Sequence, residues 1–110
     1  MRVSKVGYGV VVASLENNSP VARVAAVVNS GSRDENANEA GAAHALRVYS
    51  SLSTRNYSVF GLSRTLSQIG AGLTVLGGRE QTTFLLESNR NYSHHINIYI
   101  SNIYVYLYYH

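Results

Sequence analysis

Apolar and polar stretches alternate along the first part of the chain. The apolar run Val10–Leu15 is followed by the turn-forming stretch Glu16–Pro20 and a second apolar run, Val21–Asn29. Short β-branched runs separated by turn residues are typical of strands. We therefore expect a β-hairpin, or two neighbouring strands, over residues 10–29. A polar, glycine-bearing loop is expected at Ser30–Glu39.

A helical repeat of apolar positions begins after this loop. Asn38 is the expected N-cap, and Glu39 is expected in the first turn, where a carboxylate is favoured. His44 and Val48 lie four residues apart and share a different face of the helix from the apolar stripe. The side chains expected to form the buried stripe are Ala42, Ala45, Leu46, Tyr49 and Leu52.

A second helix and a strand pair complete this part of the chain, after a polar joint at Thr54–Ser58. Gly70 is expected to end the second helix. We expect a strand at Leu73–Leu76, a turn at Gly77–Gly78 and a strand at Thr82–Leu86. The order ββααββ predicts an α+β fold, with helices covering one face of a mostly antiparallel sheet. The apolar positions of the second helix are Val59, Leu62, Leu66 and Ile69.

The composition changes abruptly at Asn89. Residues 89–110 contain no alanine, glycine or acid, and they hold six of the nine tyrosines. Such residues are what AT-rich DNA encodes, so we interpret the tail as translated intron or a wrongly assigned gene end. The alternative is a genuine edge strand at Ile96–Tyr109. An exposed, uncharged peptide rich in β-formers is expected to aggregate.

Length and charge exclude several classes of protein. With 110 residues the chain can form one small domain. The net charge is +3, and the nine lysines and arginines are scattered, which argues against nucleic-acid binding. The absence of cysteine excludes disulfides and cysteine-ligated metals. The sequence has no apolar run long enough for a transmembrane helix, and residues 1–6 are interpreted as a start without a presequence.

His44 is the candidate for metal binding. A helix carrying His-x-x-Glu-His presents two zinc ligands and a general base on one face. This chain has Arg47 at the position of the base and Val48 at that of the second histidine. A cation repels zinc and cannot accept a proton, so we predict no metal site and no catalytic residue here.

The other candidate motifs have simpler explanations. His94 and His95 are adjacent, so on a strand they would point to opposite faces. No serine lies in a Gly-x-Ser-x-Gly elbow, and the glycine pairs at 7–9 and 70–72 lack the third glycine of a dinucleotide site. Asp34, Glu35 and Glu39 are interpreted as a solvated loop. We therefore predict no bound cofactor.

Several stretches together resemble the pitrilysin-like metallopeptidases, the group with the inverted zinc motif. The stretches are the hairpin around "ENNSP", the loop "SGSRDE", the helix start "GAAH" and the later "SQIGAGLTVLGGREQTTFLLE". The resemblance covers roughly residues 7–88 and implies the N-terminal half of one such domain. It also implies that a third zinc ligand, a glutamate, would lie beyond His110. The domain division is therefore 1–6, 7–88 and the tail 89–110.

Within this group, "HALRVYSSLSTR" and "VVASLENNSPVAR" are most similar to the core subunits of mitochondrial ubiquinol–cytochrome c reductase, complex III. That resemblance implies a non-catalytic structural role on the matrix side of the inner membrane. The implied partners are core protein one, or a processing-peptidase-like subunit, and other complex III subunits.

Two alternatives remain from the same residues. One is a processing-peptidase-like metallopeptidase or its non-catalytic substrate-binding subunit. The other is a truncated product without function, because half a domain exposes sheet edges and leaves its core unfilled.

Overall fold

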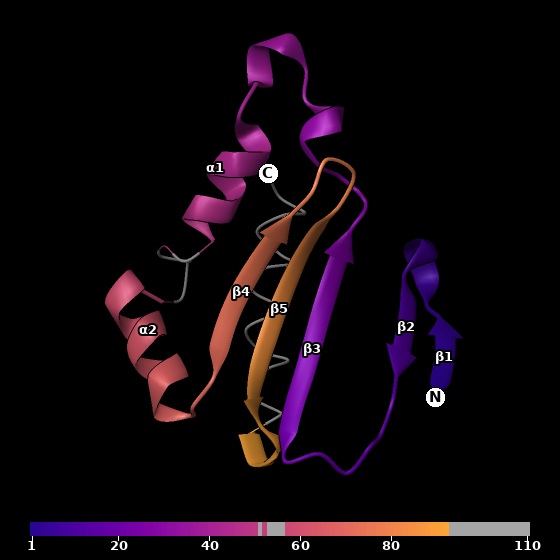
Figure 1. The fold of residues 1–110 in the computed structure, drawn as a ribbon, viewed down its shortest axis with the longest axis vertical. Coiled ribbons are helices and arrows are strands. Elements are labelled where there is room, and N and C mark those ends of the chain that lie inside the picture. The colour runs from indigo at the N-terminus through magenta and orange to yellow at the C-terminus, as the bar shows by residue number, and fades with distance from the viewer. Residues whose placement is uncertain (51, 53–56, 93–110) are drawn as a thin grey trace.

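The computed structural model describes residues 1–50, 52 and 57–92. Runs of strands and helices follow one another along the chain, as in the α+β fold expected from the sequence (Figure 1). In chain order they are β1 (Arg2–Lys5), β2 (Val11–Ser14), β3 (Val21–Val28), α1 (Ala42–Tyr49), α2 (Val59–Gln68), β4 (Gly72–Gly77) and β5 (Thr82–Asn89). Short 3-10 turns lie at Gly7–Gly9, Ser32–Asp34, Ala37–Glu39 and Arg90–Tyr92.

The centre of the fold is an antiparallel sheet with the strand order β3-β5-β4. β3 and β5 pair along eight residues each, from Val21 opposite Asn89 to Val28 opposite Thr82. β4 and β5 form the hairpin expected from their sequence, closed by a backbone bond of 2.8 Å from Gly78 N–H to the Gln81 carbonyl. The expected strand pair is thus confirmed.

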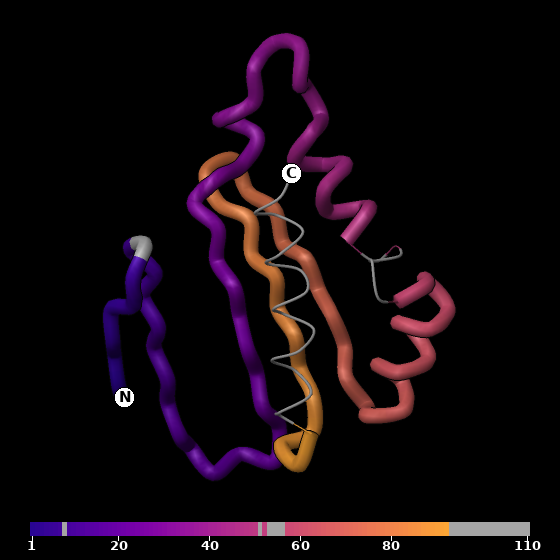
Figure 2. The backbone as a smooth tube through the Cα atoms, turned by 180° about the vertical axis from the view of Figure 1, so that it is seen from behind, coloured from indigo at the N-terminus to yellow at the C-terminus, as the bar shows by residue number. Residues whose placement is uncertain are grey.

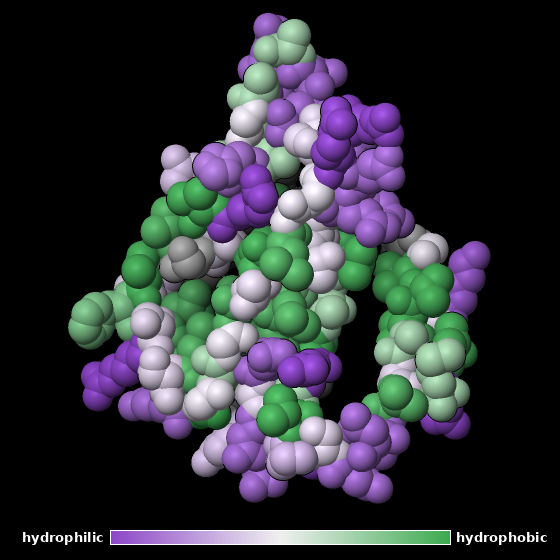
Figure 3. Space-filling model, viewed as in Figure 1, coloured by the Kyte–Doolittle hydropathy of each residue, from purple (hydrophilic) through white to green (hydrophobic). Residues whose placement is uncertain are grey.

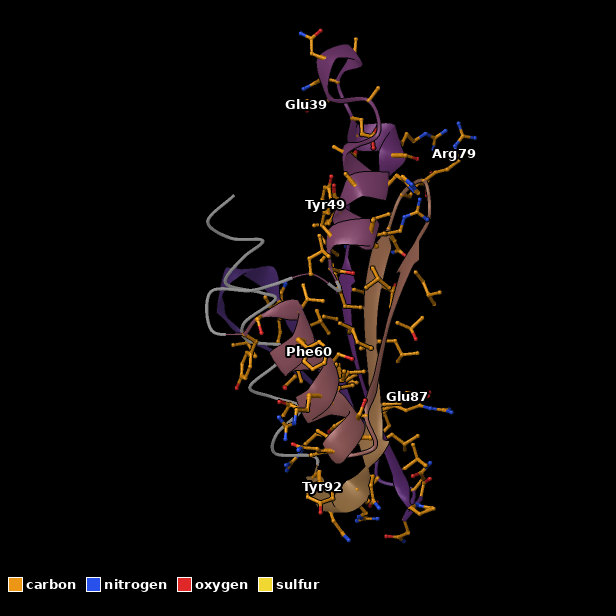
Figure 4. The ribbon with its side chains drawn as sticks, turned by 90° about the vertical axis from the view of Figure 1, so that its left-hand side faces the viewer. Glu39, Tyr49, Phe60, Arg79, Glu87 and Tyr92 are labelled. Carbon is orange, nitrogen blue, oxygen red and sulfur yellow. The ribbon has the colours of Figure 1, made fainter. Side chains whose placement is uncertain are left out.

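Both helices cover one face of this sheet, on the side of β4 (Figures 1 and 4). On this face Phe84 and Leu86 of β5 are fully buried, and Leu62 of α2 packs against Leu86. Partly buried side chains from β3, β4, α2 and the residues flanking α2 surround this pair. These are Ala22, Val24, Tyr57, Leu66, Ile69 and Leu73.

Both ends of α2 are capped by hydrogen bonds. The Ser58 hydroxyl accepts a bond from Gly61 N–H at 3.1 Å and caps the first turn. Gly70 has a φ of 64°, and the N–H groups of Gly70 and Ala71 donate to the Ser67 and Leu66 carbonyls. This pair of bonds is a Schellman motif, and it confirms Gly70 as the stop signal.

The predicted hairpin between residues 10–15 and 21–29 is wrong. β2 pairs with β1, from Lys5 opposite Val11 to Arg2 opposite Ser14, and forms a separate two-stranded sheet. This hairpin stands apart from the central sheet across an open gap (Figure 3). The strand at Arg2–Lys5 was not predicted from the sequence.

The linker between β2 and β3 is bonded to the end of the central sheet. It runs from the hairpin to the start of β3 (Figure 2). Its side chains bond the local backbone, as in the contact of 2.8 Å from Asn18 N–H to Glu16. Glu16 also pairs with Arg90, at 3.0 Å, and Arg90 N–H donates to the Pro20 carbonyl at 3.0 Å. These bonds tie the linker to the end of β5, which is already the partner of β3.

Candidate functional site

The positions of the inverted zinc motif lie on α1, but this helix begins later than predicted. Ala37–Glu39 forms a separate 3-10 turn, and Ala40 leaves the helical region with a ψ of 125°. Gly41 is the N-cap, with a φ of 93°. Asn38 is therefore not the cap, and Glu39 lies outside the first turn of α1. The sequence pattern could not separate two helical turns joined by a sharp bend.

Glu35 caps α1 in place of Asn38. Its carboxylate accepts bonds of 2.8 Å from Ala43 N–H and from Gly41 N–H, two donors that the helix start leaves unpaired. These backbone bonds, the one from Ala43 first, hold the pKa of Glu35 below the ordinary glutamate value. The sequence analysis missed this role because Glu35 lies well before the helix, where no capping pattern is expected.

The stripe predicted for α1 is only partly correct. Ala45 and Leu46 are half-buried, but Ala42, Tyr49 and Leu52 are exposed, Tyr49 at 63%. Arg47 is half-buried instead, and the helix lies against β4. α1 therefore packs the side chain of Arg47 toward the sheet. A prediction based on the spacing of apolar residues could not identify this polar position.

His44, Arg47 and Val48 form the candidate site on α1. His44 is exposed, and its Nδ1 lies 3.2 Å from Nη2 of Arg47. Because a guanidinium can only donate, Nδ1 of His44 must be the acceptor in this contact. Val48, at the position of the second histidine, has 52% of its surface exposed.

Arg47 spans from α1 to the end of β4. Its Nη1 donates to the Gly77 carbonyl at 3.4 Å, and a Cβ added to Gly77 would lie 2.4 Å from Cδ of Arg47. Gly77 thus leaves space for the arginine side chain. The sequence marked Gly77 as a turn residue and gave no sign of this contact.

These residues do not fit a zinc ion. A zinc site needs several deprotonated ligands converging on one point, and here one imidazole faces a guanidinium. Within the described part of the chain, no three histidine, cysteine, aspartate or glutamate side chains come together in a way that could hold a metal. The pair His94 and His95 lies outside the described residues.

The acidic residues of the loop make local hydrogen bonds. Asp34 accepts from Gly31 N–H at 2.9 Å, and Glu39 accepts from the Asn36 amide at 3.2 Å. Together with Glu35 they border an open cavity of about 470 Å³ between the start of α1 and the strands β3 and β5. That these acids form a solvated loop and not a catalytic pair remains a prediction.

The same loop packs tightly on the β4–β5 turn. Arg33 N–H donates to the Arg79 carbonyl at 2.9 Å, and the Arg33 side chain pairs with Glu80. Gly31 lies against that carbonyl, because an added Cβ would meet the Arg79 oxygen at 2.5 Å. The stretch "SGSRDE" therefore fixes the loop before α1 to the sheet.

None of the described helices has the length and apolar character needed to cross a bilayer.

Comparisons with known proteins were made for both the sequence and the fold. The sequence pattern of the insulinase family (peptidase family M16) matches residues 11–100. A solved protease from Helicobacter pylori superposes with a TM-score of 0.73 at 20% identity, over 83% of this chain and 22% of the protease. At that identity the likeness supports the fold alone.

Several curated relatives share one name. Cytochrome b-c1 complex subunit 2, mitochondrial, from Mus musculus is 37% identical over 91 residues, which is 83% of this chain and 20% of that protein. The human protein of that name is 38% identical over 90 residues, covering 82% and 20%. The chain thus spans about a fifth of the length of these relatives.

Proposed function

The chain belongs to the insulinase family, peptidase family M16, and we propose that it is part of a non-catalytic core subunit of mitochondrial complex III. The identity of 37% to the mouse subunit 2 supports this choice within the family. The proposed role is that of core protein two, a structural subunit of the complex that passes electrons from ubiquinol to cytochrome c. Its proposed location is the matrix side of the inner membrane.

The observation that carries the non-catalytic part of the proposal is the contact between Arg47 and His44. The guanidinium takes the place of the general base and occupies Nδ1 of the one histidine at 3.2 Å. Val48 removes the second ligand. With both groups changed, α1 has neither the ligands to hold zinc nor a base to activate water.

The proposed partners are core protein one, or a processing-peptidase-like subunit, and the other complex III subunits. The names of the relatives support membership of that complex. An active processing peptidase is disfavoured by Arg47 and Val48. A non-catalytic substrate-binding subunit would require a glycine-rich substrate loop elsewhere in the gene product, which separates it from a core subunit.

Metal analysis and a peptidase assay test the non-catalytic proposal. We expect the purified chain, dialysed against zinc and then against buffer, to retain far less than one zinc per molecule and to leave presequence peptides intact. The double variant R47E/V48H restores the motif and should retain more zinc, and H44A in that background should remove the gain. Stoichiometric zinc and peptide cleavage by the unchanged chain would contradict the proposal.

We also propose that residues 89–110 are a tail unrelated to the family, and that this tail is translated intron or a wrongly assigned gene end. The shift to tyrosine, isoleucine and asparagine supports this, whereas the family match extends to residue 100 and overlaps the first residues of the tail. Sequencing the transcript and genomic DNA across the codons for Glu87–His110 tests it. A splice donor in this region, with family sequence resuming in the spliced transcript, is expected. A mature transcript that carries the tyrosine codons to the stop would contradict an intron.

A further inference from the structure

Arg47 differs from the paired arginines of this chain. Arg23 pairs with Glu87 at 2.5 Å, Arg33 with Glu80, and Arg90 with Glu16 at 3.0 Å. Arg47 is half-buried and has no carboxylate partner in the part of the chain that the structure describes. A partly desolvated cation without a counter-ion is unfavourable unless another group compensates its charge.

The hydrogen bonds of Arg47 compensate little of that charge. The bond from Nη1 to the Gly77 carbonyl is 3.4 Å long, beyond the usual range for N–H donors. Nη2 contacts a neutral ring nitrogen of His44 at 3.2 Å. Nε is buried and has no hydrogen-bond partner among the described residues. A guanidinium with five donors is therefore bound by two weak acceptors.

This side chain lines a cavity between α1, α2 and β4. The cavity has a volume of about 300 Å³, at the lower end of the range for small-molecule sites. Besides Arg47, its polar groups are the hydroxyls of Ser50 and Ser63, and Ser50 donates to the Arg47 carbonyl at 2.7 Å. The remaining wall is aliphatic and consists of Leu62, Leu66, Leu73 and Val75.

A single cation beside an aliphatic wall favours a ligand that has one negative charge and a hydrocarbon chain. We propose that this cavity binds an aliphatic monocarboxylate, with the carboxylate on the outer nitrogens of Arg47 and the hydrocarbon chain along the leucines. A carboxylate accepts two parallel bonds from a guanidinium and would replace the long bond to Gly77. The larger cavity at the start of α1 is bordered by Asp34, Glu35 and Glu39, so it repels the same ligand.

The ligand test uses octanoate as the probe and the full chain. In an NMR titration we expect octanoate to shift the methyl signals of Leu62, Leu66 and Leu73, while octanol and acetate bind at least about tenfold more weakly. R47Q should lose octanoate affinity by about tenfold or more, since a charge-assisted contact is removed. R64Q removes an equal charge from an exposed position of α2 outside the cavity and should bind as the unchanged chain does.

A second variant keeps the test independent of any effect of R47Q on folding. Ser63 is an exposed residue of α2 that lines the cavity, so S63F should fill the space, retain Arg47 and abolish octanoate binding. Three results would overturn the proposal. They are equal binding of octanol and octanoate, unchanged affinity in folded R47Q, or no binding of octanoate where an acidic peptide does bind.

Discussion

At the scale of single residues, the helix with the zinc-motif positions is held by contacts that need no metal. Glu35 caps the start of the helix, and Arg47 contacts the end of β4. Gly31 allows the preceding loop to pack closely on the β4–β5 turn. Each of these residues acts through backbone groups of another segment. The polar residues of this region therefore have structural explanations that can be tested one at a time.

Gly31 is predicted to tolerate no side chain. In G31A the new Cβ would lie 2.5 Å from the Arg79 backbone oxygen, so the loop or the β4–β5 turn must shift. We expect G31A to lower the free energy of unfolding by about 1 to 3 kcal/mol. The control is G77A, whose Cβ meets the flexible end of the Arg47 side chain. Denaturant unfolding measures the free energy of unfolding of both variants. Equal values for G31A and G77A would contradict this packing.

Glu35 is predicted to make the start of α1 sensitive to acid. Its pKa is lowered in the folded chain by bonds from Ala43 and Gly41, so its contribution to stability is present above the ordinary glutamate pKa. That contribution is lost as the pH falls through the lowered pKa. A carbon-13 NMR titration should give Glu35 a pKa below the ordinary glutamate value. E35Q should abolish the acid-dependent loosening of Gly41 and Ala43 amides measured by hydrogen exchange, and unchanged loosening would contradict the assignment.

At the scale of elements, local signals and long-range pairing were predictable to different degrees. The end of α2 at Gly70 was predictable because a C-terminal cap is local chemistry. The hairpin of Leu73–Leu76 and Thr82–Leu86 was predictable because a short turn joins the two strands. The partner of β2 was missed because β2 pairs with β1, a strand that was not predicted from the sequence. The inward side of α1 was missed because Arg47 takes part in it.

The C-terminal end of α2 is predicted to depend on Gly70. At a φ of 64° any other residue is strained, so G70A should lower the free energy of unfolding by about 1 to 2 kcal/mol. The matched control is G72A, since Gly72 has no positive φ and its added Cβ would meet no atom within 4 Å. Thermal unfolding compares the two, and equal melting temperatures would contradict the Schellman assignment.

At the scale of the whole molecule, the chain has a small core and a large apolar surface. Phe84, Leu86 and Leu62 are the buried hydrophobic residues in the described ranges, whereas the β1–β2 hairpin exposes Val3, Val11 and others, Val11 at 62%. Apolar side chains also gather on the sheet face away from the helices (Figure 3), where Val27 and Leu76 are more than half exposed. From this exposed apolar surface we expect the isolated chain to be poorly soluble.

Stability is predicted to come from the central sheet and not from the hairpin. Removing residues 1–14 should cost less than about 1 kcal/mol, because every described side chain of β1 and β2 is already exposed. F84A should cost about 3 to 5 kcal/mol, since Phe84 is 2% exposed at the centre of β5. Limited proteolysis and thermal unfolding measure both. If removal of residues 1–14 lowered the free energy of unfolding as much as F84A does, the hairpin would contribute to stability and the prediction would be contradicted.

The central claim is that the chain belongs to a structural core subunit of complex III. The most direct measurement follows its endogenous product with an antibody raised against residues 1–50, so that detection does not depend on the tail. Mitochondrial membranes would be solubilised mildly, separated by blue-native electrophoresis and profiled by mass spectrometry. The account predicts co-migration with complex III and core protein one. Migration apart from complex III, or with an active processing peptidase, would contradict it.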